Sequence, residues 1–151
     1  MTFAKRGLAI CVVMALMPLA ALAVDTTGST SPPDLAAVRA KIKAKDFKGA
    51  LADLSGMVDG GVQHADVYNL LGFSLRKTGD YPKALTFYKK ALDFDPDHKG
   101  AHEYLGELYV ETSQLPKARE HLAILEKLCP QSCEEREDLA EAIAAAAPKT
   151  N

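Results

Sequence analysis

The residues best suited to chemistry in this sequence are two cysteines near its C-terminal end. Cys129 and Cys133 flank the turn-forming segment Pro-Gln-Ser, and they are the two that stay if a leader carrying Cys11 is removed. In an oxidising compartment an even pair of cysteines predicts a disulfide, and a proline-broken turn can bring the Cα atoms within about 7 Å. The alternative is a thiol-redox or copper site, because soft thiolates favour Cu(I).

A second candidate is a row of three glutamates. Glu103, Glu107 and Glu111 are four residues apart, so on a helix all three carboxylates share one face. Like charges at this spacing repel by a few tenths of a kcal/mol, and folding does not require them. They form either a solvated helix face or an acidic wall that meets a basic or amine-bearing ligand.

The histidines and the remaining motifs give no catalytic or metal site. His98 and His102 are one helical turn apart, but no third ligand falls in step with them in a zinc pattern, and we expect both to be structural. The sequence has no G-x-S-x-G, no H-E-x-x-H and no phosphate-binding glycine loop. We therefore predict no catalytic residue, no metal, no cofactor and no enzymatic activity.

The N-terminal segment predicts export. Lys5 and Arg6 precede an apolar run over residues 7–20, and Ala-Leu-Ala at 21–23 is a small-residue cleavage signal. These features predict a secretory leader over residues 1–23 and a periplasmic protein that is not inserted in the membrane after cleavage. Residues 24–33 are rich in Thr, Ser, Gly and Pro and predict a flexible tether.

The charge of the chain excludes two classes of partner. The formal net charge is −2, and removal of the two basic leader residues makes the mature chain still more acidic. A nucleic-acid binder needs a basic face to neutralise phosphates, and an anionic lipid surface attracts a polybasic segment. Neither feature is present, so the expected partner is another protein or peptide.

The elements that must position these residues follow an internal repeat of 34 residues. One copy holds Tyr68, Leu71, Gly72, Leu75, Ala84, Tyr88 and Pro96, and the next holds His102, Leu105, Gly106, Tyr109, Ala118, Leu122 and Pro130. This spacing resembles the tetratricopeptide-repeat family, whose signature places W-x-x-L-G-x-x-Y, A-x-x-x-F and P at these offsets.

The resemblance implies an all-α fold, a right-handed α-solenoid of about three antiparallel helix pairs with a C-terminal capping helix. The expected divisions are a degenerate first repeat over 34–64, repeats over 65–98 and 99–132, a capping helix over 133–147 and a disordered tail over 148–151. Gly72 and Gly106 are expected to let the partner helix of each pair approach closely. Ser132 and Glu135 predict a capping box that begins the last helix.

The resemblance also implies where a partner binds. In tetratricopeptide-repeat proteins the first helix of each pair lines a concave groove, and the matching positions here are Asn69, Phe73, Arg76, Glu103 and Glu107. The predicted function is an adaptor or scaffold of the bacterial cell envelope that holds a protein or peptide in this groove. Self-association through the same groove, and the thiol-redox or copper alternative, stay open.

Overall fold

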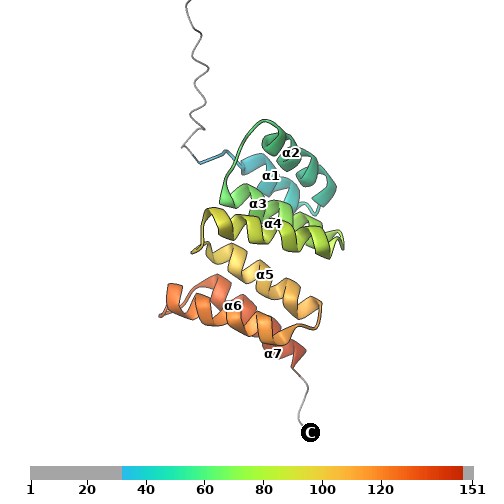
Figure 1. Cartoon of the computed structure of the whole chain (residues 1–151). Coiled ribbons are helices and arrows are strands. Elements are labelled where there is room, and N and C mark those ends of the chain that lie inside the picture. The colour runs from blue at the N-terminus through green and yellow to red at the C-terminus, as the bar shows by residue number, and fades with distance from the viewer. Residues whose placement is uncertain (1–31, 148–151) are drawn as a thin grey trace, which may run out of the picture.

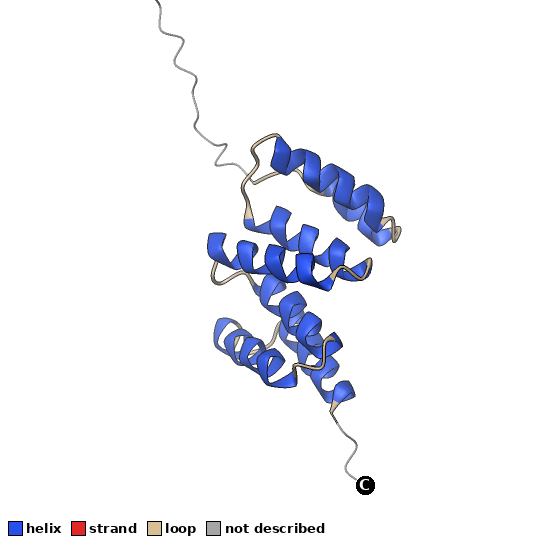
Figure 2. Ribbon diagram, turned by 45° about the vertical axis from the view of Figure 1, so that its right-hand side comes forward, coloured by secondary structure: helices blue, strands red, loops and turns tan. Residues whose placement is uncertain are grey.

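The computed structural model of this chain describes residues 32–147 as a stack of helices (Figure 1). The predicted leader over 1–23, most of the predicted tether and the predicted tail over 148–151 lie outside these residues. Within 32–147 there are seven helices and no strand (Figure 2). The helices are α1 Ala36–Lys43, α2 Phe47–Asp59, α3 Ala65–Lys77, α4 Tyr81–Phe94, α5 Lys99–Glu111, α6 Leu115–Leu128 and α7 Glu134–Ala146.

The helices nest in consecutive pairs. Helix α1 packs on α2, α3 packs on α4, and α5 packs on α6, while α2 contacts α3 and α4 contacts α5, so each pair rests on the next. The last helix, α7, packs against both α5 and α6 and closes the stack. The prediction of an all-α solenoid is confirmed. None of the helices within residues 32–147 is long and apolar enough to cross a lipid bilayer.

Local signals explain where the helices begin and end. The side chains of Asp46 and Asp80 cap α2 and α4 by accepting hydrogen bonds from the backbone N–H groups of Gly49 and Lys83. Between α3 and α4, Gly79 has φ of 87°, a left-handed conformation that glycine adopts without steric cost.

The predicted capping box of α7 is wrong. The residue before the helix is Cys133, and it makes no side-chain cap hydrogen bond. Ser132 instead donates its hydroxyl to the carboxylate of Glu137, further along the helix than the expected Glu135. The acidic first turn of α7 still fits its position, because carboxylates are favourable near the positive end of a helix dipole.

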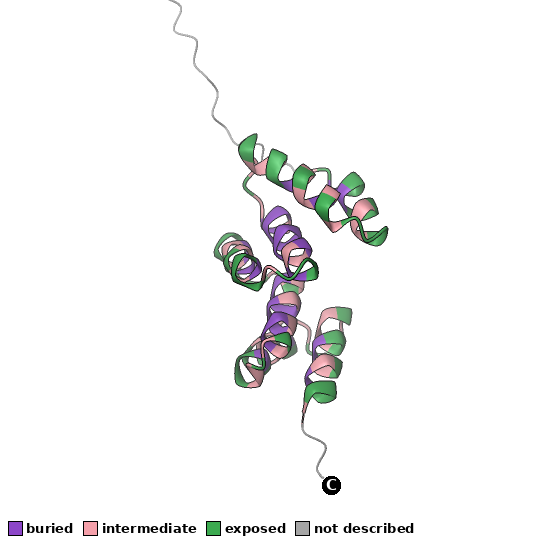
Figure 3. Cartoon of the chain, turned by 90° about the vertical axis from the view of Figure 1, so that its right-hand side faces the viewer, coloured by how far each residue is buried: buried purple, intermediate pink, exposed green. Residues whose placement is uncertain are grey.

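The first helix of each full repeat lies deepest in the stack. Helices α3 and α5 bury most of their length, whereas α4 and α6 bury only a few residues each. Figure 3 shows this as a central band of buried residues flanked by exposed helix faces. Tyr68, Tyr88, Leu105 and Leu125 are among the large side chains that are fully buried. The buried hydrophobic residues form two clusters, one that extends from α1 to the start of α5 and one that extends from α4 to α7, and α3 and α5 are packed between their neighbours.

The two signature glycines allow close contacts with different helices. A Cβ atom at Gly72 would lie 2.6 Å from the ring of Tyr88 on α4, the paired helix, as expected. At Gly106 the corresponding atom would lie 2.5 Å from Leu139 on α7. The expectation that Gly106 makes room for its own pair is therefore corrected, since it makes room for the closing helix.

Candidate functional site: an acidic pocket across the first helices

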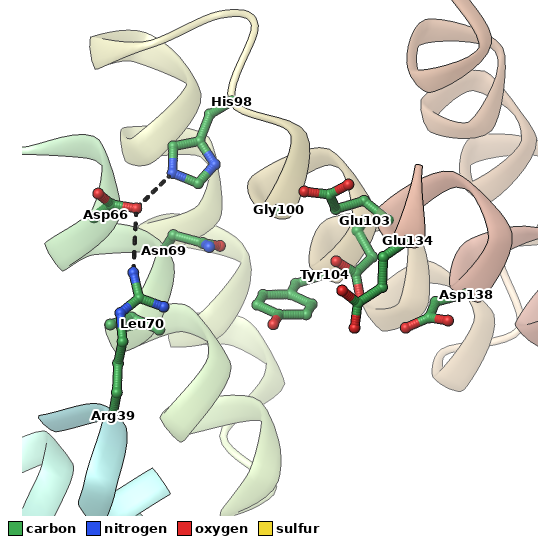
Figure 4. Close-up of a pocket in the computed structure, with 11 residues that line it drawn as sticks. Arg39, Asp66, Asn69, Leu70, His98, Gly100, Glu103, Tyr104, Glu134 and Asp138 are labelled. Carbon is green, nitrogen blue, oxygen red and sulfur yellow. Dashed lines mark hydrogen bonds and ion pairs between the residues drawn. The ribbon is translucent and has the colours of Figure 1, made fainter. Parts of the chain in front are cut away.

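A pocket of about 300 Å³ crosses the stack on the face formed by the first helices of the pairs (Figure 4). Its lining comes mainly from α3, α5 and the start of α7, and Arg39 of α1 stands at its rim. Its lining residues are Arg39, Asp66, Asn69, Leu70, His98, Gly100, Glu103, Tyr104, Glu134, Glu135 and Asp138. Five of these residues carry carboxylates, against one guanidinium and one imidazole, so the pocket is acidic.

One side of the pocket is internally neutralised. His98 Nε2 lies 3.1 Å from Asp66 Oδ1, and the guanidinium of Arg39 lies 3.8 Å from the same oxygen. Figure 4 shows both partners converging on Asp66 from α1 and from the start of α5. The Arg39 side chain is more than half exposed, so this ion pair adds little stability. It does orient the guanidinium along the rim of the pocket.

The other side of the pocket collects carboxylates without a cation. It is formed by Glu103 on α5 and by Glu134, Glu135 and Asp138 on α7. In the described part of the chain none of these four carboxylates makes an ion pair. Like charges brought together in this way repel, and the repulsion is strongest where water is excluded.

Glu103 is the acidic group most affected by this repulsion and by burial. The residue is 7% exposed. Burial, and then the charges of Glu107, Asp138 and Glu135, raise the pKa of Glu103 to about 8, with Arg76 opposing them. The carboxyl group is therefore held largely protonated at neutral pH, and a cation placed beside it would favour its ionised form.

Asn69 brings a buried amide to the same pocket. The residue is 4% exposed, and its Oδ1 has no hydrogen-bond partner among residues 32–147. Its Nδ2 lies so close to Gly100 that a Cβ atom there would be 3.2 Å away. Figure 4 shows the amide pointing from α3 toward Tyr104 and Gly100. An unpaired buried amide oxygen costs about 1–3 kcal/mol, so this group is unusual in a stable core.

Arg76, one of the predicted groove residues, is buried between helices. Arg76 is 3% exposed, and its guanidinium binds Glu107 and lies 2.7 Å from Glu111. Burial alone lowers the pKa of Arg76, but the effects of Tyr88, Glu107 and Glu111 outweigh it, and the pKa stands above the ordinary value. Arg76 therefore ties α3 to α5, and it occupies two of the three glutamates of the predicted acidic wall.

Phe73 lies beside the pocket and does not line it. Its ring centroid is 4.8 Å from that of Tyr104 and 6.1 Å from that of Phe47, and the residue is half-buried. The guanidinium of Arg76 lies 5.6 Å from the Phe73 centroid, within cation–π distance. Of the five predicted groove residues, Asn69 and Glu103 line the pocket, while Phe73, Arg76 and Glu107 form a packed cluster next to it.

Several pocket residues were missed by the sequence reasoning. Asp66 and Tyr104 stand on the same helices as the predicted residues, and the repeat spacing alone could have suggested them. The three α7 acids gave only the signal of an acidic helix start. Nothing in their spacing indicated that α7 turns this end toward α5, because that orientation comes from the packing of Leu139 against Gly106.

The cysteines lie at the turn that leads into α7. The structure joins Cys129 to Cys133 in a disulfide with a Cα–Cα distance of 6.0 Å. Arg136 on the first turn of α7 donates hydrogen bonds to the carbonyl oxygens of Cys129 and Gln131, at 3.1 and 3.2 Å. In the bonded form the pair has no thiolate to offer a copper ion. Its position instead links it to the helix that carries three of the pocket acids.

The histidines have separate partners. The side chain of His98 accepts a hydrogen bond from the backbone N–H of Ala101 and so caps α5. His102 contacts His121 at 2.9 Å and the Pro96 carbonyl oxygen at 2.9 Å. Burial, and then the charge of His102, lower the pKa of His121 to about 4. Across residues 32–147 no three His, Cys, Asp or Glu side chains are grouped to hold a metal ion.

A stack of paired helices with a polar pocket across its first helices defines a helical-repeat interaction module. Residues 65–98 match the family model of the tetratricopeptide repeat. The chain therefore contains a tetratricopeptide repeat at these residues. A module of this family supports protein–protein interaction.

Three curated relatives match parts of the chain. The sol locus transcriptional repressor of Clostridium acetobutylicum is 38% identical over 55 residues, which is 36% of this chain and 17% of that protein. The BBSome complex member BBS4 of Bos taurus is 38% identical over 60 residues, 40% of this chain and 12% of the relative. The uncharacterized protein ycf37 of Guillardia theta is 36% identical over 62 residues, 40% of this chain and 35% of the relative. The match therefore spans about a third or less of each relative's length.

Two solved structures share the arrangement of helices. MamA from Desulfovibrio magneticus RS-1, residues 41 to the end, superposes with a TM-score of 0.57 and 28% identity, covering 64% of this chain and 55% of that one. The type III secretion translocator chaperone SycD of Yersinia enterocolitica superposes with a TM-score of 0.64 and 14% identity, covering 73% and 86%. At 14% identity the second likeness shows the fold alone.

Proposed function

We propose that this protein is a non-enzymatic adaptor or scaffold of the bacterial cell envelope that binds a partner protein or peptide across its first helices. The observation that carries the proposal is the pocket, which draws its lining from α1, α3, α5 and α7 and from none of the second helices. A ligand lying there would touch every repeat of the stack at once. Repeat proteins use their extended surfaces in this way.

The electrostatics of the pocket support a binding role over a purely structural one. The fold gains nothing from placing the buried Glu103 against the α7 acids without a cation, or from an Asn69 amide oxygen that has no hydrogen bond within residues 32–147. Both features become favourable only when another molecule supplies the missing donors. The neighbouring cluster of Arg76, Glu107 and Glu111 is by contrast complete within the chain.

The location in the envelope rests on the sequence of the first 23 residues. Positive charge, an apolar run and a small-residue cleavage signal together direct secretion. Osmotic-shock fractionation of cells that express the full chain, followed by mass spectrometry of the mature N-terminus, tests this part. We expect periplasmic protein that begins at Val24. Retention in the cytoplasm with an intact leader would refute it.

Site-specific photocrosslinking in living cells tests the binding face. A photoreactive residue in place of Arg39, at the rim of the pocket, is expected to trap a partner protein. The matched control is Lys89, an exposed residue on α4, a helix that contributes nothing to the pocket. Crosslinks of equal yield from both positions, or from Lys89 alone, would refute binding across the first helices.

A further inference from the structure

We propose that the acidic side of the pocket receives the cationic head group of a lysine or arginine side chain from the bound protein. This inference rests on the proposed binding function and names the chemistry that the same pocket recognises. Four acidic side chains line that side, on α5 and α7, and none of them makes an ion pair within residues 32–147.

Asn69 supplies an independent observation. Its amide is buried, aimed into the pocket and without a partner for Oδ1, beside the floor formed by Gly100 (Figure 4). Because no hydrogen bond from residues 32–147 fixes the orientation of the amide, a half-turn about its last bond brings the oxygen to the Gly100 side. An ammonium or guanidinium group there could donate to this oxygen and to Glu103 together, since both cations carry several N–H donors.

The dimensions and the distribution of charge restrict the ligand. At about 300 Å³ the pocket is at the lower end of the range for small-molecule sites, which suits one long side chain and excludes a folded element. The positive side, with Arg39 and His98, is already satisfied by Asp66. Within residues 32–147, an acidic ligand would meet only cations that already contact Asp66. A basic ligand would meet three α7 carboxylates without an ion pair among the same residues, and the carboxyl of Glu103, whose ionised form it would favour.

Recognition of the cation depends on α7, because that helix supplies three of the four acidic residues. Glu134, Glu135 and Asp138 belong to the closing helix, and Glu103 belongs to α5. A cation between them would therefore bridge the last full pair and the closing helix. Charge-assisted hydrogen bonds of this kind are roughly twice as strong as neutral ones, so a single side chain could dominate the affinity.

The first experiment is selection from a displayed library of random heptapeptides against the purified mature chain. We expect enrichment of lysine or arginine at one position. Enrichment of peptides without a basic residue would overturn the inference while leaving the proposed binding function intact. Recovery of no peptide at all would count against both.

The second experiment uses variants with the same change in charge at two places. The pocket variant is Glu134→Gln with Asp138→Gln, and the control is Glu120→Gln with Glu126→Gln, two exposed residues of α6 outside the pocket. With an N-acetylated form of the selected peptide, fluorescence anisotropy is expected to show about tenfold weaker binding for the pocket variant. The control should change by less than about twofold. Equal weakening of both variants would mean that the peptide responds to the overall negative charge of the protein and not to the pocket, and would overturn the inference.

A mutant cycle and one further variant locate the cation. Replacing the selected lysine or arginine of the peptide by glutamine should weaken binding to the parent chain, and the same replacement should have little further effect on the pocket variant. Asn69→Leu should weaken binding while the melting temperature stays the same or rises, because the unpaired amide is removed. Full additivity in the cycle, or unchanged binding by the Asn69 variant, would overturn the assignment.

Discussion

Helix α5 carries two glutamates, Glu103 and Glu107, one turn apart, whose neighbouring side chains carry opposite charges. Glu107 is bound by the buried guanidinium of Arg76, which also lies 2.7 Å from Glu111. Glu103 faces the acids of α7 with no cation, and its pKa is raised to about 8. Residue type and helical spacing are the same, so the difference comes from the neighbouring helix. Helix α3 supplies a cation to one end of the row, and α7 supplies carboxylates to the other.

This contrast separates a structural cluster from a binding surface. The cluster of Arg76, Glu107 and Glu111 is closed, since its charges are matched inside the chain. The acidic side of the pocket is open, since none of its acidic groups is paired with a cation within residues 32–147. A row of acids in a repeat protein therefore has to be judged residue by residue, according to the helix that each one faces.

The largest expected effect comes from breaking the closed cluster. Arg76→Met should lower the free energy of unfolding by about 3 kcal/mol, because the buried guanidinium is lost and the partly buried Glu107 is left without its cation, while the more exposed Glu111 loses little. Urea unfolding followed by circular dichroism measures the loss. Adding Glu107→Gln and Glu111→Gln to the same variant should recover part of it. A loss below about 1 kcal/mol would mean that Arg76 contributes no more than an exposed ion pair.

The next effect comes from separating α7 from α5 at the acidic side of the pocket. Gly106→Ala places a methyl group where Leu139 of α7 stands, and we expect the unfolding free energy to fall by about 1–3 kcal/mol. The control is Gly56→Ala in α2, where a Cβ meets nothing within 4 Å. That control should stabilise the protein by roughly 0.5–1 kcal/mol, since alanine is the better helix former. Equal effects of the two variants would contradict the close contact between α5 and α7.

A smaller effect is expected from releasing the turn before α7. Cys129→Ser with Cys133→Ser opens a short loop, so the loss of stability should be about 2 kcal/mol, the low end for a disulfide. Thermal unfolding of the variant, and of the parent chain with and without reductant, measures it. If the reduced parent and the variant are both as stable as the oxidised parent, the disulfide does not hold α7 in place.

The smallest effect concerns the charge of Glu103. Its pKa is raised from 4.5 to about 8 in the folded protein, so the stability it contributes is fully present below about pH 4.5 and is lost as the pH rises through 8. Glu103→Gln keeps the side chain neutral. The variant should match the parent near pH 5 and exceed its melting temperature by about 4 °C at pH 9. This corresponds to a gain of about 1 kcal/mol in the free energy of unfolding, after allowance for screening by solvent.

Melting curves across this pH range test the sign of the effect, and Glu120→Gln on the exposed face of α6 is the control. That control should follow the parent at every pH. A Glu103→Gln variant less stable than the parent at pH 9 would show that the carboxylate is ionised without cost, and the contrast along α5 would disappear.

Much of the fold could be predicted from the sequence, because its determinants are local or recur at a fixed interval. The aspartates that cap α2 and α4, the glycine between α3 and α4, and Gly72 at the crossing of α3 with α4 all act within one repeat. The site was predicted less well. Asn69 and Glu103 do line the pocket, but the spacing could not distinguish them from Arg76 and Glu107, which belong to the same helix faces.

By itself the sequence determined that helices pair and stack, since the 34-residue repeat of bulky and small side chains leaves helices no other way to bury their apolar faces. Only the tertiary structure decided which acids are neutralised. Arg76 lies 31 and 35 positions away from the glutamates it binds, and the α7 acids are also separated from Glu103 by about a full repeat. Contacts over such separations depend on how one helix is turned against another, and the packing of buried residues such as Leu139 against Gly106 sets that angle.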